Sequence, residues 1–135
     1  MTTREDIESY LIRMDVDFEE IEEGMWVIRP AEGATPVVVD YSPPLIVLRL
    51  KVMDLPADAD DTRLAAFYRR LLELNAGDIL HGSYGIEAQE VILSDALELE
   101  DLDFSELRSS YESLVLAASS HLADLTGLVP VAQEG

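Results

Sequence analysis

The sequence predicts an α+β domain with an antiparallel sheet flanked by helices, in the order α-β-β-β(-β)-α-β-β-α. Two observations lead to this class. Apolar residues recur at the helical spacing of three and four in three segments, near both ends of the chain and at its middle. Between them, short runs of alternating apolar and polar residues follow one another across turn residues, which is typical of hairpins in an antiparallel sheet.

Length and composition agree with one folded domain. The 135 residues are enough for a single core, and a hydrophobic fraction of 48% with a mean hydropathy of +0.09 argues against general disorder. We expect residues 1–127 to form this domain and residues 128–135 to be a flexible tail. The chain has no cysteine, which excludes disulfides, thiolate nucleophiles and cysteine-ligated zinc.

The charge balance restricts the partners. A net charge of −19 repels the phosphates of nucleic acids and anionic lipids, and it favours a basic partner. No apolar run approaches the roughly 20 residues that span a bilayer. The N-terminus lacks the basic start and apolar stretch of a signal peptide. We therefore expect a cytoplasmic protein that binds neither nucleic acid nor membrane.

The first 36 residues predict a short helix and a hairpin. Thr3 is a suitable N-cap and acidic residues follow it in the first turn. The apolar stripe of this helix contains Ile7, Tyr10, Leu11 and Met14. Residues 18–22 and 25–29 predict two strands joined at Glu23-Gly24, with Trp26 and Ile28 on one face. The loop over residues 30–36 is either a mobile flap or a simple connector.

Two further strands are predicted before the central helix, at residues 37–41 and 45–53. The second of these is the most apolar strand in the chain. One face is entirely apolar and is expected in the core, with Ile46, Leu48, Leu50 and Val52. The other is a mixed row of Leu45, Val47, Arg49, Lys51 and Met53. Because a water-exposed row would be more polar, either a helix or another chain is expected to cover part of it.

The central helix is expected after an acidic cap cluster at residues 58–61. Its broad apolar stripe contains Leu64, Phe67, Tyr68, Leu71, Leu72 and Asn75. Asn75 and Gly77 are residues that favour a left-handed helix end. A second hairpin follows, with strands at residues 79–87 and 91–99.

The last helix begins at Asp103, which forms a capping box with Glu106. Gly127 is a suitable stop for it. Its stripe contains Leu107, Tyr111, Leu114, Ala118, Leu122 and Leu125.

No residue pattern predicts a catalytic, cofactor-binding or metal site. The two histidines, His81 and His121, lack any metal-ligand spacing, and the acidic pairs lack the other residues of a calcium loop. The Gly82–Gly85 segment lacks the strand–loop–helix context of a phosphate-binding loop. We therefore expect no enzymatic activity and no cofactor.

The central stretch resembles the YbjN family, whose fold is similar to that of the class I type III secretion chaperones. The resemblance lies in the "LLxLN" pattern of residues 71–75, the strand pair containing residues 82–87 and 91–93, and the segment 97–101 before a long helix. It also follows the order of elements along nearly the whole chain. It implies a small, acidic, homodimeric bacterial protein without enzymatic activity, of either a sensory-regulatory or a chaperone kind.

From this we expect a homodimeric protein-binding module that holds a segment of a partner polypeptide. The predicted dimer contacts are Leu64, Phe67, Tyr68 and Leu71, with packing on their own sheet as the alternative. The predicted partner-binding residues are Leu45, Val47, Arg49 and Met53, near a free sheet edge to which an extended, basic peptide adds. An alternative function is a small-molecule sensor or stress regulator with a pocket near Trp26, Tyr41 and Tyr84.

Overall fold

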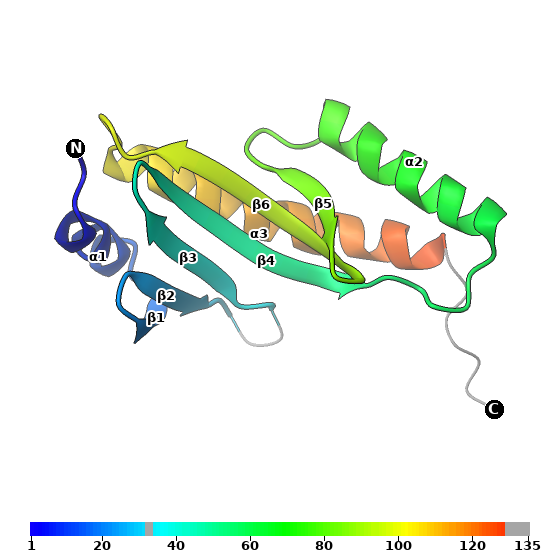
Figure 1. Cartoon of the computed structure of the whole chain (residues 1–135), viewed down its shortest axis with the longest axis horizontal. Coiled ribbons are helices and arrows are strands. Elements are labelled where there is room, and N and C mark those ends of the chain that lie inside the picture. The colour runs from blue at the N-terminus through cyan, green and yellow to red at the C-terminus, as the bar shows by residue number, and fades with distance from the viewer. Residues whose placement is uncertain (32–33, 129–135) are drawn as a thin grey trace.

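The computed structural model describes residues 1–31 and 34–128. It contains one six-stranded antiparallel sheet, in the spatial order β1-β2-β3-β4-β6-β5, and three helices (Figure 1). The elements are α1 (Arg4–Arg13), β1 (Asp17–Glu22), β2 (Met25–Arg29), β3 (Val37–Ser42), β4 (Leu45–Asp54), α2 (Asp61–Gly77), β5 (Ser83–Glu87), β6 (Glu90–Glu98) and α3 (Phe104–Gly127). The predicted class and element order are confirmed, with four strands before the central helix.

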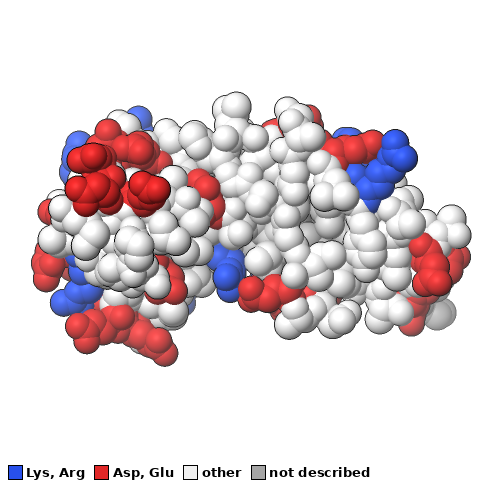
Figure 2. Space-filling model, turned by 45° about the horizontal axis from the view of Figure 1, so that its top comes forward, with Lys and Arg blue, Asp and Glu red and all other residues white. Residues whose placement is uncertain are grey.

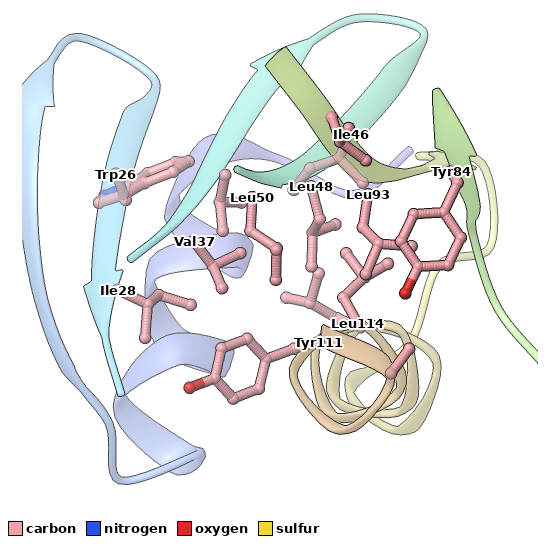
Figure 3. Packing of buried hydrophobic residues seen from close by; sticks show 14 of the residues in the cluster. Trp26, Ile28, Val37, Ile46, Leu48, Leu50, Tyr84, Leu93, Tyr111 and Leu114 are labelled. Atoms are coloured by element: carbon pink, nitrogen blue, oxygen red, sulfur yellow. The ribbon is translucent and has the colours of Figure 1, made fainter. Parts of the chain in front are cut away.

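The core lies between one face of the sheet and the helices. Figure 3 shows Val37, Leu48 and Leu93 pointing toward Leu114 of α3. Ile7 and Leu11 of α1 are fully buried in the same cluster, as are Trp26 and Ile28, whose predicted common face is confirmed. The opposite face of the sheet therefore carries the alternate residues of each strand.

The capping box predicted at Asp103 is present, and Thr3, the predicted N-cap of α1, forms a second capping box with Asp6. Thr3 accepts a hydrogen bond from the N–H of Asp6 in α1, and Asp103 accepts one from Glu106 in α3. The predicted left-handed end of α2 is wrong, because α2 ends at Asp78 in the right-handed region with φ −111°. Asn75 does not end the helix. Its side-chain amide forms hydrogen bonds with the main chain of Tyr84 in β5.

The second hairpin is shorter than predicted, because β5 begins at Ser83 and not at Ile79. Its turn consists of Ala88 and Gln89, both with positive φ (48° and 71°), while Glu90 already pairs with Glu87. Two positive φ values in a two-residue loop correspond to a type I′ turn, which is usually built from Asn and Gly. The turn therefore lies within the predicted connection of residues 88–90, although it lacks these usual residues.

The helix stripes are narrower than predicted. In α2 the buried residues are Phe67, Leu71 and Leu74, whereas Tyr68 and Leu72 are exposed. In α3 Ala117 is buried and Leu122 is exposed. Helix α2 borders the sheet beside β5, so only a narrow side of it reaches the core.

Parts of two predictions lie outside the described residues. These are positions 32–33 of the loop 30–36, and positions 129–135 of the predicted tail. None of the described helices is long and apolar enough to cross a membrane.

Candidate functional site

The sheet face opposite α1 and α3 has an apolar centre that no described helix covers. We call this surface the open face. Strand pairing places Val27 beside Val38, and Val47 beside Ala96, across four neighbouring strands. The apolar residues of the open face are Met25, Val27, Val38, Leu45, Val47, Ile92 and Ala96. Leu45 and Ala96 are exposed, Ile92 is buried and the others are half-buried, so a single chain leaves most of this surface in contact with water.

The cations on the open face are already paired with acids. Arg49 lies 2.9 Å from Glu87, and Lys51 lies 2.9 Å from Asp54 and 3.2 Å from Glu90. Hydrogen bonds to these two carboxylates raise the pKa of Lys51. Acidic residues outnumber basic residues on the sheet, as they do in the whole chain. The surface therefore attracts cationic groups.

The predicted partner-binding residues do not all share this face. Leu45, Val47 and Arg49 do, as predicted. Met53 does not, because a β-bulge between Lys51 and Met53 shifts the register and pairs Met53 with Val91 of the core face. One extra residue in a strand moves every following side chain to the other face.

The main chain of β4 is not available to a peptide. β3 pairs with one side of β4 and β6 with the other, so strand addition beside Val47 or Arg49 is excluded. A peptide can meet these residues only through their side chains on the open face. Their role in partner binding stays a prediction.

The two outer strands of the sheet, β1 and β5, differ in whether their outward main-chain groups have hydrogen-bond partners. In β5, Tyr84 donates its N–H to Asn75 Oδ1 at 2.6 Å and accepts a hydrogen bond from Asn75 Nδ2 at 3.2 Å. The amide of Asn75 thus pairs with β5 as a neighbouring strand would. The edge of β1 has no such partner among the described residues, and it carries acids at four of its six positions: Asp17, Glu19, Glu20 and Glu22.

The predicted dimer residues divide into two groups. Phe67 and Leu71 are 0% and 5% exposed and pack within their own chain. Tyr68 is exposed, and with Leu72 and Ile86 it borders a hollow of about 200 Å³ between α2 and β5. Figure 2 shows a mostly uncharged surface between the two charged ends of the molecule, with one basic and one acidic group at its lower centre. The dimer contact stays a prediction.

The alternative pocket near Trp26, Tyr41 and Tyr84 does not form. Trp26 lies in β2 and Tyr84 in β5, with three strands between them. Trp26 is fully buried and its indole N–H donates to Glu8 at 3.4 Å. Trp26 and Tyr84 therefore belong to different parts of the core.

A polar cluster that the sequence analysis missed joins β5 to α3. The Tyr84 hydroxyl lies 2.8 Å from Nδ1 of His121, and Nε2 of His121 lies 3.7 Å from Asp78. Burial raises the pKa of the Tyr84 phenol, with a smaller contribution from Asp124, so the phenol stays protonated. The cluster lies where α2, β5 and α3 meet, which fits a structural tie. Among the described residues no group of His, Asp or Glu side chains is arranged to hold a metal ion.

Comparison with known proteins adds a family and a set of similar folds. A sequence model of the CesT_Tir_1 family, which consists of type III secretion chaperones, matches residues 1–130. No curated protein matches the sequence.

Several solved structures share the fold at low sequence identity. A chain of the heterodimeric ExoU–SpcU complex from the type III secretion system of Pseudomonas aeruginosa is 13% identical, with a TM-score of 0.66 over 91% of this chain and 97% of that chain. YbjN from E. coli is 12% identical, with a TM-score of 0.67 over 90% and 92%. A chain of the ExsC–ExsE complex is 16% identical, with a TM-score of 0.64 over 98% and 100%. The resemblance to YbjN therefore holds for the fold.

Proposed function

The chain belongs to the CesT_Tir_1 family of type III secretion chaperones, and on this premise we propose that it is a chaperone-like protein without enzymatic activity. It holds a segment of a partner polypeptide, acts as a homodimer and works in the cytoplasm. The similar structures that contain a second protein, such as the ExsC–ExsE and HopA1–SchA complexes, support a protein partner.

The open face is the observation that carries this proposal. Most of its apolar residues are half-buried or exposed, and it lies on a sheet whose other face is already packed. Contiguous exposed apolar surface on a soluble protein commonly marks an interaction site. A bound polypeptide segment would cover Val27, Val38 and Val47 and remove them from water.

The partner segment is basic and extended. The chain carries 28 acids against 9 basic residues, and the cations of the open face are neutralised by neighbours within the chain. The edge of β1 offers main-chain groups beside acidic side chains. An extended segment with lysine or arginine would add to this edge by hydrogen bonds and gain charge complementarity at the same time.

The homodimer forms through α2 and β5. Leu64, Phe67, Tyr68 and Leu71 remain the proposed contact region. Of these, Tyr68 is exposed and Leu64 is half-buried. Leu72 extends the same side of the helix with 68% of its area exposed. Contact with a second copy would bury this leucine and the apolar hollow beside it. The stabilising free energy scales with the apolar area removed from water.

The dimer is tested by Leu72→Asp, with Leu71→Asp as a matched comparison. Because Leu72 is exposed, Leu72→Asp should leave the subunit folded and convert it to a monomer, measured by light scattering and circular dichroism. Leu71→Asp should unfold the chain, since its carboxylate would be buried. A Leu72→Asp protein that remains fully dimeric would contradict the proposed interface.

Partner binding is tested by titrating basic and acidic peptides of equal length while recording amide shifts of the open face and of β1. The basic peptide should shift Val27, Val38 and Val47 or the β1 amides, and the effect should weaken as salt is added. Equal binding of both peptides would contradict charge complementarity. If neither peptide binds, the proposed function fails.

A further inference from the structure

The last part of β6 has no strand paired with its outer side among the described residues. β5 begins at Ser83, which pairs with Ser94, so residues 95–98 extend past the start of β5 (Figure 1). The chain before β5 turns away toward α3, where the main chain of His81 exchanges hydrogen bonds with the Ser113 hydroxyl. This end of β6 is therefore paired on the β4 side alone.

The open main-chain groups can be assigned from a hydrogen bond near the end of β6. Leu99 donates its N–H to the carbonyl of Pro44, at 2.9 Å, on the β4 side. Along an antiparallel strand successive residues direct these groups to opposite sides. Leu97 therefore also faces β4, whereas Ala96 and Glu98 direct their N–H and C=O groups outward. Both residues are exposed, so an incoming strand can reach them.

Carboxylates accompany this edge on both faces of the sheet. Asp95 lies in the core-facing row, opposite Leu48, and accepts a hydrogen bond from the fully buried Ser110 at 2.7 Å. Glu98 lies on the open face, and Glu100 and Asp101 follow directly after the strand. None of these four acids forms an ion pair with a described residue, in contrast to Glu87 and Glu90 on the paired part of the hairpin.

The charges select among possible occupants. A second copy pairing along the same edge would bring Asp95 and Glu98 of both copies together, and like charges facing each other across strands are unfavourable. A segment with lysine or arginine at alternate positions would place a cation beside Asp95 on one face or beside Glu98 on the other. Charge complementarity therefore favours a basic strand from a different protein.

We propose that the edge of β6 between Asp95 and Glu98 binds a short, extended, basic segment as an added strand. This inference rests on the proposed function, because it assumes a polypeptide partner. It adds a second binding position, which β2, β3 and β4 separate from the edge of β1. Partner binding at two positions would hold a longer segment against one chain.

The probe is a synthetic peptide with alternating lysine and valine, compared with the same peptide carrying glutamate for lysine. Amide hydrogen exchange is measured in the complete protein. The lysine peptide should slow exchange at Ala96 and Glu98, and the glutamate peptide should not. Fast exchange at these amides in the free protein is also required, because slow exchange there would mean that the edge is already covered.

The variant Ala96→Pro removes the outward N–H without introducing a charge, and proline is tolerated where that group faces solvent. It should weaken binding at this edge about tenfold, the order of magnitude expected for the loss of a main-chain hydrogen bond and of strand geometry. Asp95→Asn, which keeps the contact with Ser110, should weaken it about threefold. Glu22→Thr on β1 is the control and should leave protection of Ala96 unchanged.

Protection confined to β1, or equal binding by Ala96→Pro and the unmodified protein, would overturn this inference and leave the proposed function standing. Absence of any peptide-dependent protection would overturn both. If Ala96→Pro fails to fold, Asp95→Asn and the two peptides provide the test. Unchanged affinity of Asp95→Asn for the lysine peptide would contradict the role of the carboxylate.

Discussion

The two outer edges of the sheet are built in opposite ways. At β5, the side chain of Asn75 completes the hydrogen bonding of Tyr84, and α2 lies alongside. At β1, the main chain is left without a described partner and acids occupy most positions. A register shift between Glu20 and Glu22 also distorts this strand. Charges and bulges are the means by which natural proteins keep open edges from pairing with the wrong chain.

The edge of β5 is therefore structural, whereas the edge of β1 has main-chain groups that a partner can reach. A closed edge beside apolar side chains suits contact through side chains, as proposed for the dimer at α2 and β5. On the proposed function, an open edge with acids would reject other copies of this acidic chain and would accept a basic segment.

The largest effect is expected at Gly82, at the start of the closed edge. Its φ is +92°, and a Cβ there would lie 2.6 Å from a methyl of Leu114 and 2.8 Å from the carbonyl of Ser94. Gly82→Ala should therefore lower the free energy of unfolding by about 2–4 kcal/mol in chemical denaturation. Gly77→Ala is the control, because a Cβ at this position has no atom within 4 Å. This change should raise the free energy of unfolding by about 0.5–1 kcal/mol. Equal effects of the two changes would refute the close approach at Gly82.

Asn75→Leu tests the closure of β5 directly. The change keeps the approximate size of the side chain but leaves the N–H and C=O of Tyr84 without their partner, which should cost about 1–3 kcal/mol of unfolding free energy. Exchange of the Tyr84 amide should become faster as well. If that amide exchanges at the same rate in both proteins, Asn75 does not close the edge.

At the open edge, loss of charge should change association more than stability. Glu22→Thr should alter the free energy of unfolding by no more than about 0.5 kcal/mol, while self-association at high concentration increases and affinity for a basic peptide falls. Glu87→Thr makes the same substitution on β5 and should leave self-association unchanged. Sedimentation velocity measures the self-association of each variant. Equal self-association of Glu22→Thr and Glu87→Thr would contradict the proposed difference between the edges of β1 and β5.

The smallest effect concerns Asp6, in the first turn of α1. Hydrogen bonds from the backbone and side chain of Thr3 hold the pKa of this carboxyl below its ordinary value of 3.8. A lowered folded-state pKa contributes stability above the unfolded-state value, and this contribution is lost as pH falls through the folded-state value. Asp6→Ala should therefore be less stable than the unmodified protein at pH 7 and equal to it in strong acid. A deficit that persists in strong acid would show that the carboxylate is not its source.

Much of the fold followed from periodicity. The stripe of α1, the common face of Trp26 and Ile28, and the mixed row containing Leu45 and Val47 were all predicted from spacing. These features depend on side-chain alternation, which a sequence displays directly.

The features that were missed depend on register and on partners distant in the sequence. The bulge that moves Met53 to the core face has no composition signal. Asn75 matched a helix end, although its amide pairs with a strand nine residues later. Asp95 did carry a signal: it is a charge in a row of β6 that is otherwise apolar.

The central claim is that this chain is a dimer that holds a basic polypeptide segment. Native mass spectrometry of the protein purified gently, at low salt, from its own host tests it most directly. The predicted result is a mass of two chains plus one reproducible additional polypeptide, released as ionic strength rises. A mass of one chain with nothing bound would contradict both the dimer and the polypeptide partner.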